Sequence, residues 1–170
     1  NLSFEYAIKS ARQGFKKAEA RVGFMYLMGT GVDKNYHKSF YWIKKAADKN
    51  IGTAQNQLGY FYDIGLVTKK NQKRAVFWYR KAEANGSRLA QFNLAYRYRT
   101  GVGIKQDYAM AFYWYGYAAK QDDAISKYRL AEFYALGRGV KKNFKMAFYW
   151  FKKAAVQGYG PAMFQVAQSY

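Results

Sequence analysis

Cysteine is absent from the 170 residues of this sequence, which excludes disulfide bonds and thiolate metal sites. The absence leaves the redox compartment open, because an oxidising compartment would tolerate the chain as well as the cytosol would. No apolar run reaches the roughly 18 residues that a membrane-spanning helix needs. No segment shows the strict alternation of apolar and polar residues that is typical of a half-buried strand.

Groups that could carry out chemistry are also scarce. The only histidine, His37, lies between Tyr36 and Lys38, and a lone surface histidine is usually incidental. Among the ten acidic residues only Asp122 and Asp123 are adjacent, and adjacent residues do not converge on one ligand from a helix face. No spacing of metal-ligating residues is present. We therefore predict no enzymatic activity, no metal site and no cofactor; an enzyme would need chemistry from outside this chain.

Positive charge, in contrast, is in large excess. The chain has 29 lysines and arginines against ten aspartates and glutamates, which gives a net charge of +19. A charge of that size governs solubility and association rather than fold. It favours acidic proteins, nucleic acid, or the anionic polymers of a membrane or envelope as binding partners.

Aromatic residues make up 21% of the chain, and they recur at a fixed interval. All the tryptophans of the chain stand 36 residues apart, at Trp42, Trp78, Trp114 and Trp150. Each lies in an aromatic run that is followed by a small residue, as Trp42 is followed by Ala46 and Ala47. A fixed period of about 20 to 50 residues indicates a repeat architecture, in which each unit stacks only on its neighbours.

The period divides the chain into four full units and two halves. Residues 1–14 match the second half of a unit, and residues 159–170 match the first half. The full units are expected at residues 15–50, 51–86, 87–122 and 123–158. Because the chain starts and stops within a unit, we expect it to be a fragment of a longer array. Its exposed half-units are candidates for end-to-end contacts between copies.

Each unit is predicted to fold as two helices. In the first unit Ala18, Val22 and Tyr26 follow the i, i+4, i+8 spacing of one helix face. The residue after Val22 is small in every unit, at Gly23, Gly59, Ala95 and Ala131. Glycine weakens a helix interior, so a packing reason is expected, and a small residue here predicts the close approach of another helix.

Helix ends are marked by glycine, asparagine and aspartate. The first helix is expected to stop at a left-handed glycine, at Gly29, Gly65, Gly101 and Gly137. The second helix is expected to follow an N-cap, at Asn35, Asn71, Asp107 and Asn143. It should end at residues that tolerate a left-handed turn, at Asn50, Gly86, Asp122 and Gly158. The second unit departs from this pattern, because Val67 stands where the others have a second loop glycine.

The combined unit reads Ala-x3-Leu-Gly-x2-Tyr-x2-Gly-x-Gly-Val-x2-Asn/Asp-x3-Ala-x2-Trp-x3-Ala-Ala-x2-Gly. It resembles the Sel1-like repeat, a relative of the tetratricopeptide repeat, which has a period of about 34 residues. The resemblance implies an all-α fold, a right-handed α/α superhelical solenoid of helix-turn-helix repeats. It also implies, by analogy, a non-catalytic adaptor or scaffold for protein interactions. Many bacterial members are exported, including the enhanced-entry proteins, so the resemblance implies a periplasmic or secreted, virulence-related factor.

The tryptophan column is interpreted as core, because an aromatic stripe at helical spacing usually packs inside. In solenoids of this family the first helix lines the concave side, so its remaining face is the predicted groove for a partner. The groove residues are Arg21, Asn56, Gln57, Tyr60, Phe92, Asn93, Tyr96, Tyr128 and Arg129. Aromatic, arginine and amide side chains are common in binding hot spots. The alternative is that some of these aromatic residues pack between neighbouring units.

A column of lysines precedes the second helices and forms the predicted basic edge. Its residues are Lys34, Lys69, Lys70, Lys105, Lys141 and Lys142. Our first hypothesis is a scaffold that holds a peptide or a partner domain in the groove, while this edge attracts acidic partners. The alternative function is polyanion binding, to nucleic acid or an anionic envelope polymer, through the basic edge. No known nucleic-acid motif is present, so this alternative ranks second. A merely solvated run of charge remains the simplest interpretation.

Overall fold

A computed structural model of the chain describes residues 2–169. Within these residues all regular secondary structure is helical, without a strand. The helices are α1 (Leu2–Arg12), α2 (Lys16–Met28), α3 (Tyr36–Asp48), α4 (Gly52–Ile64), α5 (Gln72–Ala84), α6 (Arg88–Thr100), α7 (Tyr108–Lys120), α8 (Ala124–Leu136), α9 (Phe144–Val156) and α10 (Gly160–Ala167). The all-α fold predicted from the repeat is therefore confirmed.

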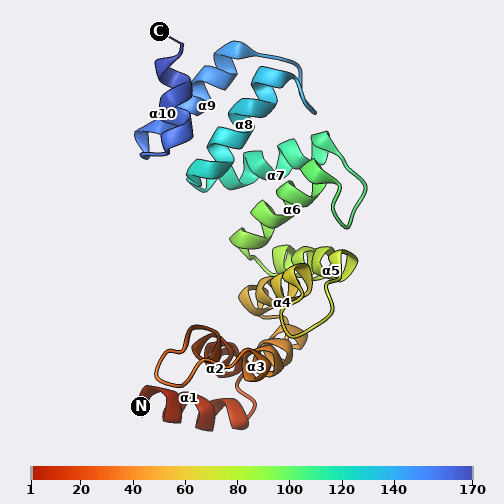
Figure 1. Cartoon of the computed structure of the whole chain (residues 1–170), viewed down its shortest axis with the longest axis vertical. Helices are drawn as coiled ribbons and strands as arrows, with labels where there is room; N and C mark the ends of the chain where they lie inside the picture. The colour runs from red at the N-terminus through yellow and green to blue at the C-terminus, as the bar shows by residue number, and fades with distance from the viewer. Residues whose placement is uncertain (1, 170) are drawn as a thin grey trace. The chain divides into compact units, whose positions relative to one another are not determined.

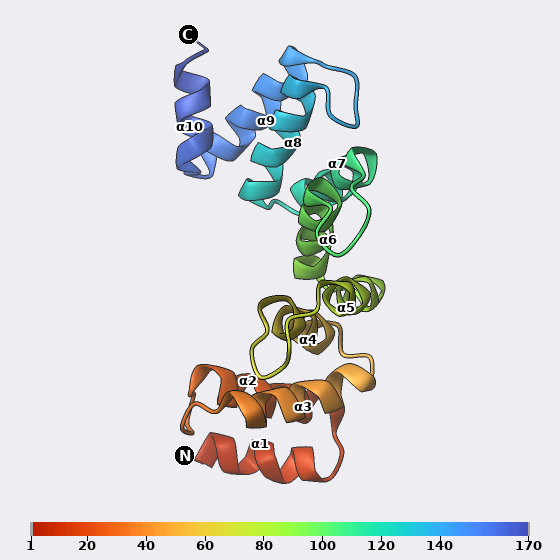
Figure 2. The same ribbon diagram turned by 45° about the vertical axis from the view of Figure 1, so that its right-hand side comes forward.

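The chain forms two compact units, residues 1–90 and 91–170, and their boundary falls within α6. In the first unit α1, α2 and α3 lie side by side, and α4 packs on both α3 and α5 (Figures 1 and 2). In the second unit α8 packs on α7 and α9, and α10 packs on α9. Among residues 2–169 no helix is both long and apolar enough to cross a membrane.

The predicted N-caps of the second helices are confirmed. Asn35 and Asn71 accept hydrogen bonds at 2.9 Å from the backbone N–H groups of Lys38 and Arg74. Asp107 and Asn143 make the same contact three residues ahead, at 2.9 and 3.0 Å. Such a cap stabilises a helix by about 1 kcal/mol, because it satisfies a backbone donor that has no partner within the helix. The four caps therefore fix where α3, α5, α7 and α9 begin.

The helix ends have the predicted left-handed residues. The loop of the second repeat keeps the same backbone although its sequence lacks the second glycine. Gly29 ends α2 at φ 75°, and Asn50 and Asp122 follow the second helices at φ 61° and 71°. In the second repeat Val67 adopts φ 69°, although the equivalent Gly31 at φ 71° has no side chain. A β-branched residue is strained in this region. The loop backbone is thus kept even where its sequence disfavours it.

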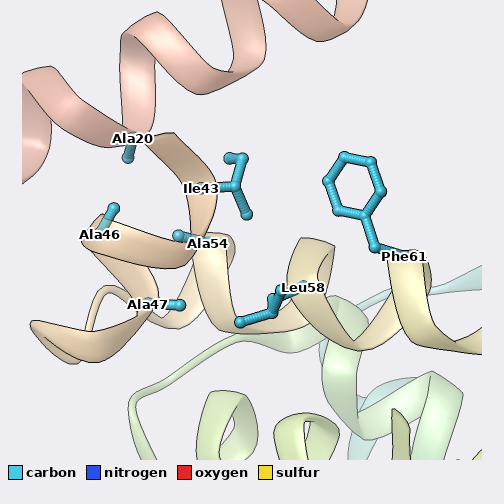
Figure 3. Packing of buried hydrophobic residues seen from close by; sticks show 7 residues of the cluster. All are labelled: Ala20, Ile43, Ala46, Ala47, Ala54, Leu58 and Phe61. Atoms are coloured by element: carbon cyan, nitrogen blue, oxygen red, sulfur yellow. The ribbon is translucent and has the colours of Figure 1, made fainter. Parts of the chain in front are cut away.

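The small residues after Val22 and its equivalents have the predicted packing reason. A Cβ added to Gly23 would lie 2.7 Å from Ile43 Cγ1, and one added to Gly59 would lie 2.7 Å from Tyr79 Cε1. Figure 3 shows Ile43 among side chains of α2, α3 and α4, where alanines leave room for close helix contact. In these two repeats the second helix therefore places a fully buried side chain against a glycine of the first.

The tryptophans pack in or against the core, as interpreted, but they are not its most deeply buried residues. Trp42 is 9% exposed and the other tryptophans are half-buried, whereas Ile43, Tyr79 and Tyr115 are at most 1% exposed. Ile43 and Tyr79, each the residue after a tryptophan, point at the small residue of the first helix, because successive helical residues are turned by about 100°. The tryptophan packs at the border of the core, between the buried residue and the surface.

Candidate interaction surfaces

The predicted groove residues lie on the first helices α2, α4, α6 and α8, but they do not share one environment. Tyr60 is 44% and Tyr96 is 39% exposed. Arg21 is exposed and donates from Nη2 to Ser3 Oγ at 3.1 Å. Gln57, Asn93 and Arg129 are half-buried. We call these positions the first-helix face of each compact unit: Arg21, Gln57 and Tyr60 in the first unit, and Asn93, Tyr96 and Arg129 in the second.

The other three groove residues belong to the interior register, which corrects their expected placement. Asn56 is only 8% exposed. The half-buried ring of Phe92 packs edge-to-face on Tyr115, with centroids 5.9 Å apart. Tyr128 lies 5.3 Å from the rings of both Phe151 and Tyr159. Each comes one residue before a residue of the first-helix face, and this difference along the helix turns its side chain toward a neighbouring helix. The packing alternative therefore holds for Tyr128, whose partner Tyr159 belongs to the next predicted repeat, whereas Phe92 packs on Tyr115 within its own repeat.

The pKa values of Tyr128 and Arg129 in α8 are shifted by burial and by the neighbouring Glu132. Arg129 Nη1 donates to Glu132 Oε2 at 2.8 Å. Burial favours the neutral form of Arg129, but the Glu132 carboxylate outweighs it and the pKa of Arg129 is raised. Burial raises the pKa of Tyr128, and Glu132 adds to that shift. Both groups thus keep their protons at neutral pH, so α8 presents a guanidinium and a phenol.

Tyr96 is the groove residue with the most cationic surroundings. The guanidinium groups of Arg97 and Arg99 lie 5.3 and 5.2 Å from its ring centroid. These distances are typical of cation–π contacts, which hold a ring in one orientation. Arg99 also interacts with the buried Tyr115. Burial raises the pKa of this phenol, and Arg99 opposes that shift. The exposed ring of Tyr96 is therefore fixed in a basic environment.

The lysines of the basic edge are all exposed in the loops before the second helices. Among the described residues none of the six forms an ion pair. Lys142 contacts an aromatic ring instead, with Nζ 4.6 Å from the centroid of Phe144. Unpaired surface lysines are available to anions, but solvation alone would also account for them.

His37 is exposed at the start of α3. Within residues 2–169 no three histidine, cysteine, aspartate or glutamate side chains lie close enough to hold a metal ion.

A buried polar residue near the start of each first helix was not found from the sequence. These residues are Glu19, Gln55, Gln91 and Lys127, and each is at most 5% exposed. In three repeats the C-cap residue of the second helix donates a hydrogen bond to this buried polar residue. Lys49 Nζ reaches Glu19 at 2.8 Å, Asn85 reaches Gln55 at 3.0 Å, and Gln121 reaches Gln91 at 2.9 Å. The 36-residue register, applied to polar rather than apolar residues, would have revealed this column.

A second missed feature is a column of exposed aromatic residues on the second helices. Its residues are Tyr41, Phe77, Tyr113 and Tyr149, between 48% and 56% exposed. Each stands edge-on to the tryptophan that follows it, with centroids 4.9 to 5.3 Å apart. A lysine covers three of these rings: Lys45, Lys81 and Lys153 lie 5.5, 4.9 and 5.6 Å from the centroids of Tyr41, Phe77 and Tyr149. We call these four residues the second-helix column.

Comparison with known proteins gives a consistent match along the chain. The Sel1 repeat family matches residues 1–15, 16–51, 52–87, 88–123 and 124–159. A crystal structure of a Sel1 repeat protein from Oxalobacter formigenes is 34% identical, with a TM-score of 0.89. That match covers 99% of this chain and 69% of the other. No curated protein sequence matches.

Another similar structure is a protective antigen of uropathogenic Escherichia coli strains that displays an SLR fold. It is 33% identical over 96% of this chain, with a TM-score of 0.92. The match covers 35% of that protein, so this chain spans about a third of its length. An immunity protein from Pseudomonas aeruginosa, 21% identical with a TM-score of 0.57, covers 94% of this chain and 59% of its own, and shows likeness of fold alone.

Proposed function

The chain belongs to the Sel1 repeat family, and on this premise we propose that it is a non-catalytic scaffold that binds a peptide or a partner domain through its first-helix face. Proteins built from Sel1 repeats are protein-interaction scaffolds, and the family fold is generally non-catalytic. The net charge of +19 favours a partner with acidic segments. An exported or virulence-related role stays a prediction from the family.

The observation that carries the proposal is the pair of exposed tyrosines, Tyr60 and Tyr96, at the same register of two first helices. A tyrosine supplies a large rigid contact surface and a hydroxyl, and tyrosine and arginine are enriched at binding hot spots. Tyr96 is additionally held by Arg97 and Arg99. Each of these tyrosines, with an amide one turn before it, is a suitable contact for an extended peptide on its own compact unit.

The test compares two pairs of exposed aromatic residues. The variant Tyr60→Ala/Tyr96→Ala removes the first-helix pair, and Phe77→Ala/Tyr149→Ala removes an equally exposed pair from the second-helix column. Partner capture from an extract of the source cells is measured for both, with melting temperatures as a folding control. We expect the first variant to bind its partner about thirtyfold more weakly, the loss expected for one hot spot of about 2 kcal/mol. Equal recovery by both variants would contradict the proposal.

A second candidate function is polyanion binding through the basic edge, which the exposure of its six unpaired lysines favours. The variant Lys69→Glu/Lys70→Glu/Lys141→Glu tests it beside the tyrosine variant. Phosphate contacts predict that the logarithm of affinity falls steeply and linearly with the logarithm of salt concentration. If only the lysine variant fails to bind, and nucleic acid competes for the site, polyanion binding replaces the scaffold function.

A further inference from the structure

A pocket of about 260 Å³ opens on the second unit, between the second helices α7 and α9. Its walls include Phe112 and Tyr113 of α7, Tyr134 of α8 and Trp150 of α9. Leu130, which is 3% exposed, also lines it. None of these residues belongs to the first-helix face, so the pocket is a separate place on the molecule.

The pocket exists because the repeat lacks a side chain at one position. Gly116 lines it, whereas the equivalent residues of the other repeats are Lys44, Arg80 and Lys152. An added Cβ would meet only Leu130 Cδ1, at 3.9 Å, which is ordinary contact. Its φ is not in the left-handed region either. Glycine weakens a helix interior relative to alanine, so neither backbone nor packing explains why this helix carries one.

The aromatic walls of the pocket are already held in place. Phe112 and Tyr134 pack edge-to-face, with centroids 5.2 Å apart. Tyr117, which replaces the lysine of the other repeats, lies 6.3 Å from Trp114. Tyr113 and Tyr117 remain 56% and 46% exposed at the rim. Pockets for small-molecule ligands usually hold about 300–1,000 Å³, so this volume fits one large side chain rather than a complete cofactor.

The charge at the rim of the pocket indicates what kind of partner segment would supply that side chain. Lys120 is the charged residue of the lining, and no acidic residue lines the pocket. Among the described residues Lys120 has no ion-pair partner. In the first repeat the equivalent residue is Asp48, which pairs with Lys44 at 3.1 Å. The third repeat therefore offers an unpaired ammonium beside an apolar pocket, on a chain with a net charge of +19.

We propose that this pocket binds one phenylalanine or leucine side chain from an acidic segment of a partner protein, and that a carboxylate of the segment pairs with Lys120. Aromatic walls around a single deep contact are the usual form of a hot-spot pocket. The inference goes beyond the first-helix face, because it assigns a second docking site whose lining shares no residue with that face. It requires no contact with Tyr60 or Tyr96.

The decisive variant is Gly116→Lys, which restores the side chain of the other repeats at a position that lines the pocket. It removes a helix-interior glycine and adds a positive charge, so neither helix propensity nor charge attraction predicts weaker binding of an acidic peptide. The matched control is Gly116→Ala, whose methyl group leaves most of the pocket open. Lys120→Glu tests the charge at the rim.

The probe is the labelled peptide Asp-Asp-Phe-Asp-Asp, with a glycine-centred peptide of the same charge and a lysine-flanked peptide as controls. Fluorescence polarisation gives the affinities. Burial of one phenylalanine predicts that the first peptide binds about tenfold to a hundredfold tighter than the glycine peptide. Gly116→Lys should abolish this difference, Gly116→Ala should keep it, and Lys120→Glu should weaken binding about tenfold.

Several outcomes would overturn the proposal. Unchanged binding by Gly116→Lys excludes the pocket, and equal binding of the phenylalanine and glycine peptides reduces the effect to charge alone. Binding of a neutral chitooligosaccharide that Gly116→Lys abolishes, without peptide binding, would make the pocket a sugar site. If Tyr60→Ala/Tyr96→Ala removes peptide binding and Gly116→Lys does not, the pocket proposal fails while the first-helix proposal stands.

Discussion

Helices α3 and α7 are the second helices of the first and third repeats, and they share one backbone plan. Both have 13 residues, and both begin after a capping side chain, Asn35 or Asp107. In each, the residue after the tryptophan is fully buried, Ile43 in α3 and Tyr115 in α7. The core is thus built in the same way in both repeats, although the buried side chains differ in size and shape.

The exposed faces of the two helices are different. On α3, Lys44 pairs with Asp48, and Lys45 covers Tyr41 and Trp42 at 5.5 and 5.2 Å. On α7 the same positions hold Gly116, Lys120 and Tyr117, which open an aromatic pocket in place of an ion pair. The comparison teaches that the repeat register determines the core, while substitutions at solvent positions give each repeat its own surface.

The turns that follow the two helices differ in the same manner. Asn50 after α3 and Asp122 after α7 have nearly the same φ, 61° and 71°. Gln55 donates to Asn50 Oδ1 at 3.2 Å, which is a neutral amide pair. The buried Lys127 donates to Asp122 Oδ1, which is an ion pair. The polar chemistry changes while the turn is kept.

The largest expected effect separates the shared core of α7 from its variable surface. Tyr115→Ala removes a fully buried ring and should cost about 3–5 kcal/mol, because it leaves a cavity. Tyr113→Ala, two residues earlier and 56% exposed, should change the stability by about 0.5 kcal/mol or less. Urea unfolding followed by circular dichroism measures both. Similar losses for the two variants would contradict the division between core and surface.

A pH-dependent effect should distinguish the two turns. The Lys127 ammonium group holds the pKa of Asp122 below its ordinary value of 3.8, through a hydrogen bond and through its charge. A lowered folded-state pKa contributes stability above the unfolded value, and this contribution is lost as the pH falls through the folded value. Asp122→Asn should therefore lower the melting temperature at pH 7, and the difference from the wild type should shrink below about pH 3.8.

The control for that experiment copies the chemistry of the first repeat. Asp122→Asn/Lys127→Gln recreates the amide pair of Asn50 and Gln55, and removes the buried ammonium that the single variant leaves without its carboxylate. The double variant should melt above the single one at pH 7. A difference between Asp122→Asn and the wild type that stays constant from pH 7 to pH 3 would show that the ion pair is not its cause.

The loop of the second repeat tests whether the register also determines backbone geometry. Val67 has φ 69°, and relief of the strain by Val67→Gly should raise the stability by about 1 kcal/mol. The lost contact of Val67 with the core of α3 and α4 limits the gain. The matched control is Val32→Gly, which removes a packed side chain without relieving a left-handed backbone. Thermal melts should move in opposite directions; a destabilised Val67→Gly would mean that packing dominates.

Two glycines on first and second helices should respond oppositely to the same change. Gly116→Ala should stabilise the chain by about 0.5–1 kcal/mol, because alanine favours the helix and its methyl group meets only ordinary contact. Gly59→Ala should destabilise it, because the methyl group would lie 2.7 Å from Tyr79 Cε1 and 3.2 Å from the Ala75 carbonyl oxygen. Melting temperatures of the two variants decide, and a loss for Gly116→Ala would show that the pocket glycine is structural.

The smallest effect is expected at the ion pair of α3. Lys44 and Asp48 are about half exposed, with side chains 52% and 49% accessible. Exposed pairs at i and i+4 contribute about 0.3–0.5 kcal/mol and are screened by salt. Asp48→Ala should therefore change the urea midpoint slightly at low salt and not at high salt. A larger, salt-independent loss would mean that the surface of α3 contributes to the core.

Much of the fold followed from the sequence because its determinants are local. The caps at Asn35 and Asn71 and the left-handed residues at Asn50 and Asp122 depend on neighbours along the chain. The small residues Gly23 and Gly59 could also be assigned a packing role, since the repeat lines up equivalent positions. The limits of the individual repeats as drawn from the sequence, and the binding role of the predicted groove, stay predictions.

Burial was less predictable, because it depends on how one helix is turned toward another. The sequence placed Asn56, Phe92 and Tyr128 on an open face. They lie one residue before the outward positions of their helices, so their side chains pack against neighbouring helices. The same difference of one residue makes Tyr115, and not Trp114, the fully buried residue.

The sequence alone determined the repeat length, the helix ends and the all-α fold, because a period of 36 residues and local capping chemistry are written in the order of residues. Only the tertiary structure decided which side chains remain in contact with solvent. The missing side chain at Gly116 becomes a pocket only when Tyr134 and Trp150 of the next repeat pack around it. A pocket of this kind is a property of helices from two repeats, and no single segment contains it.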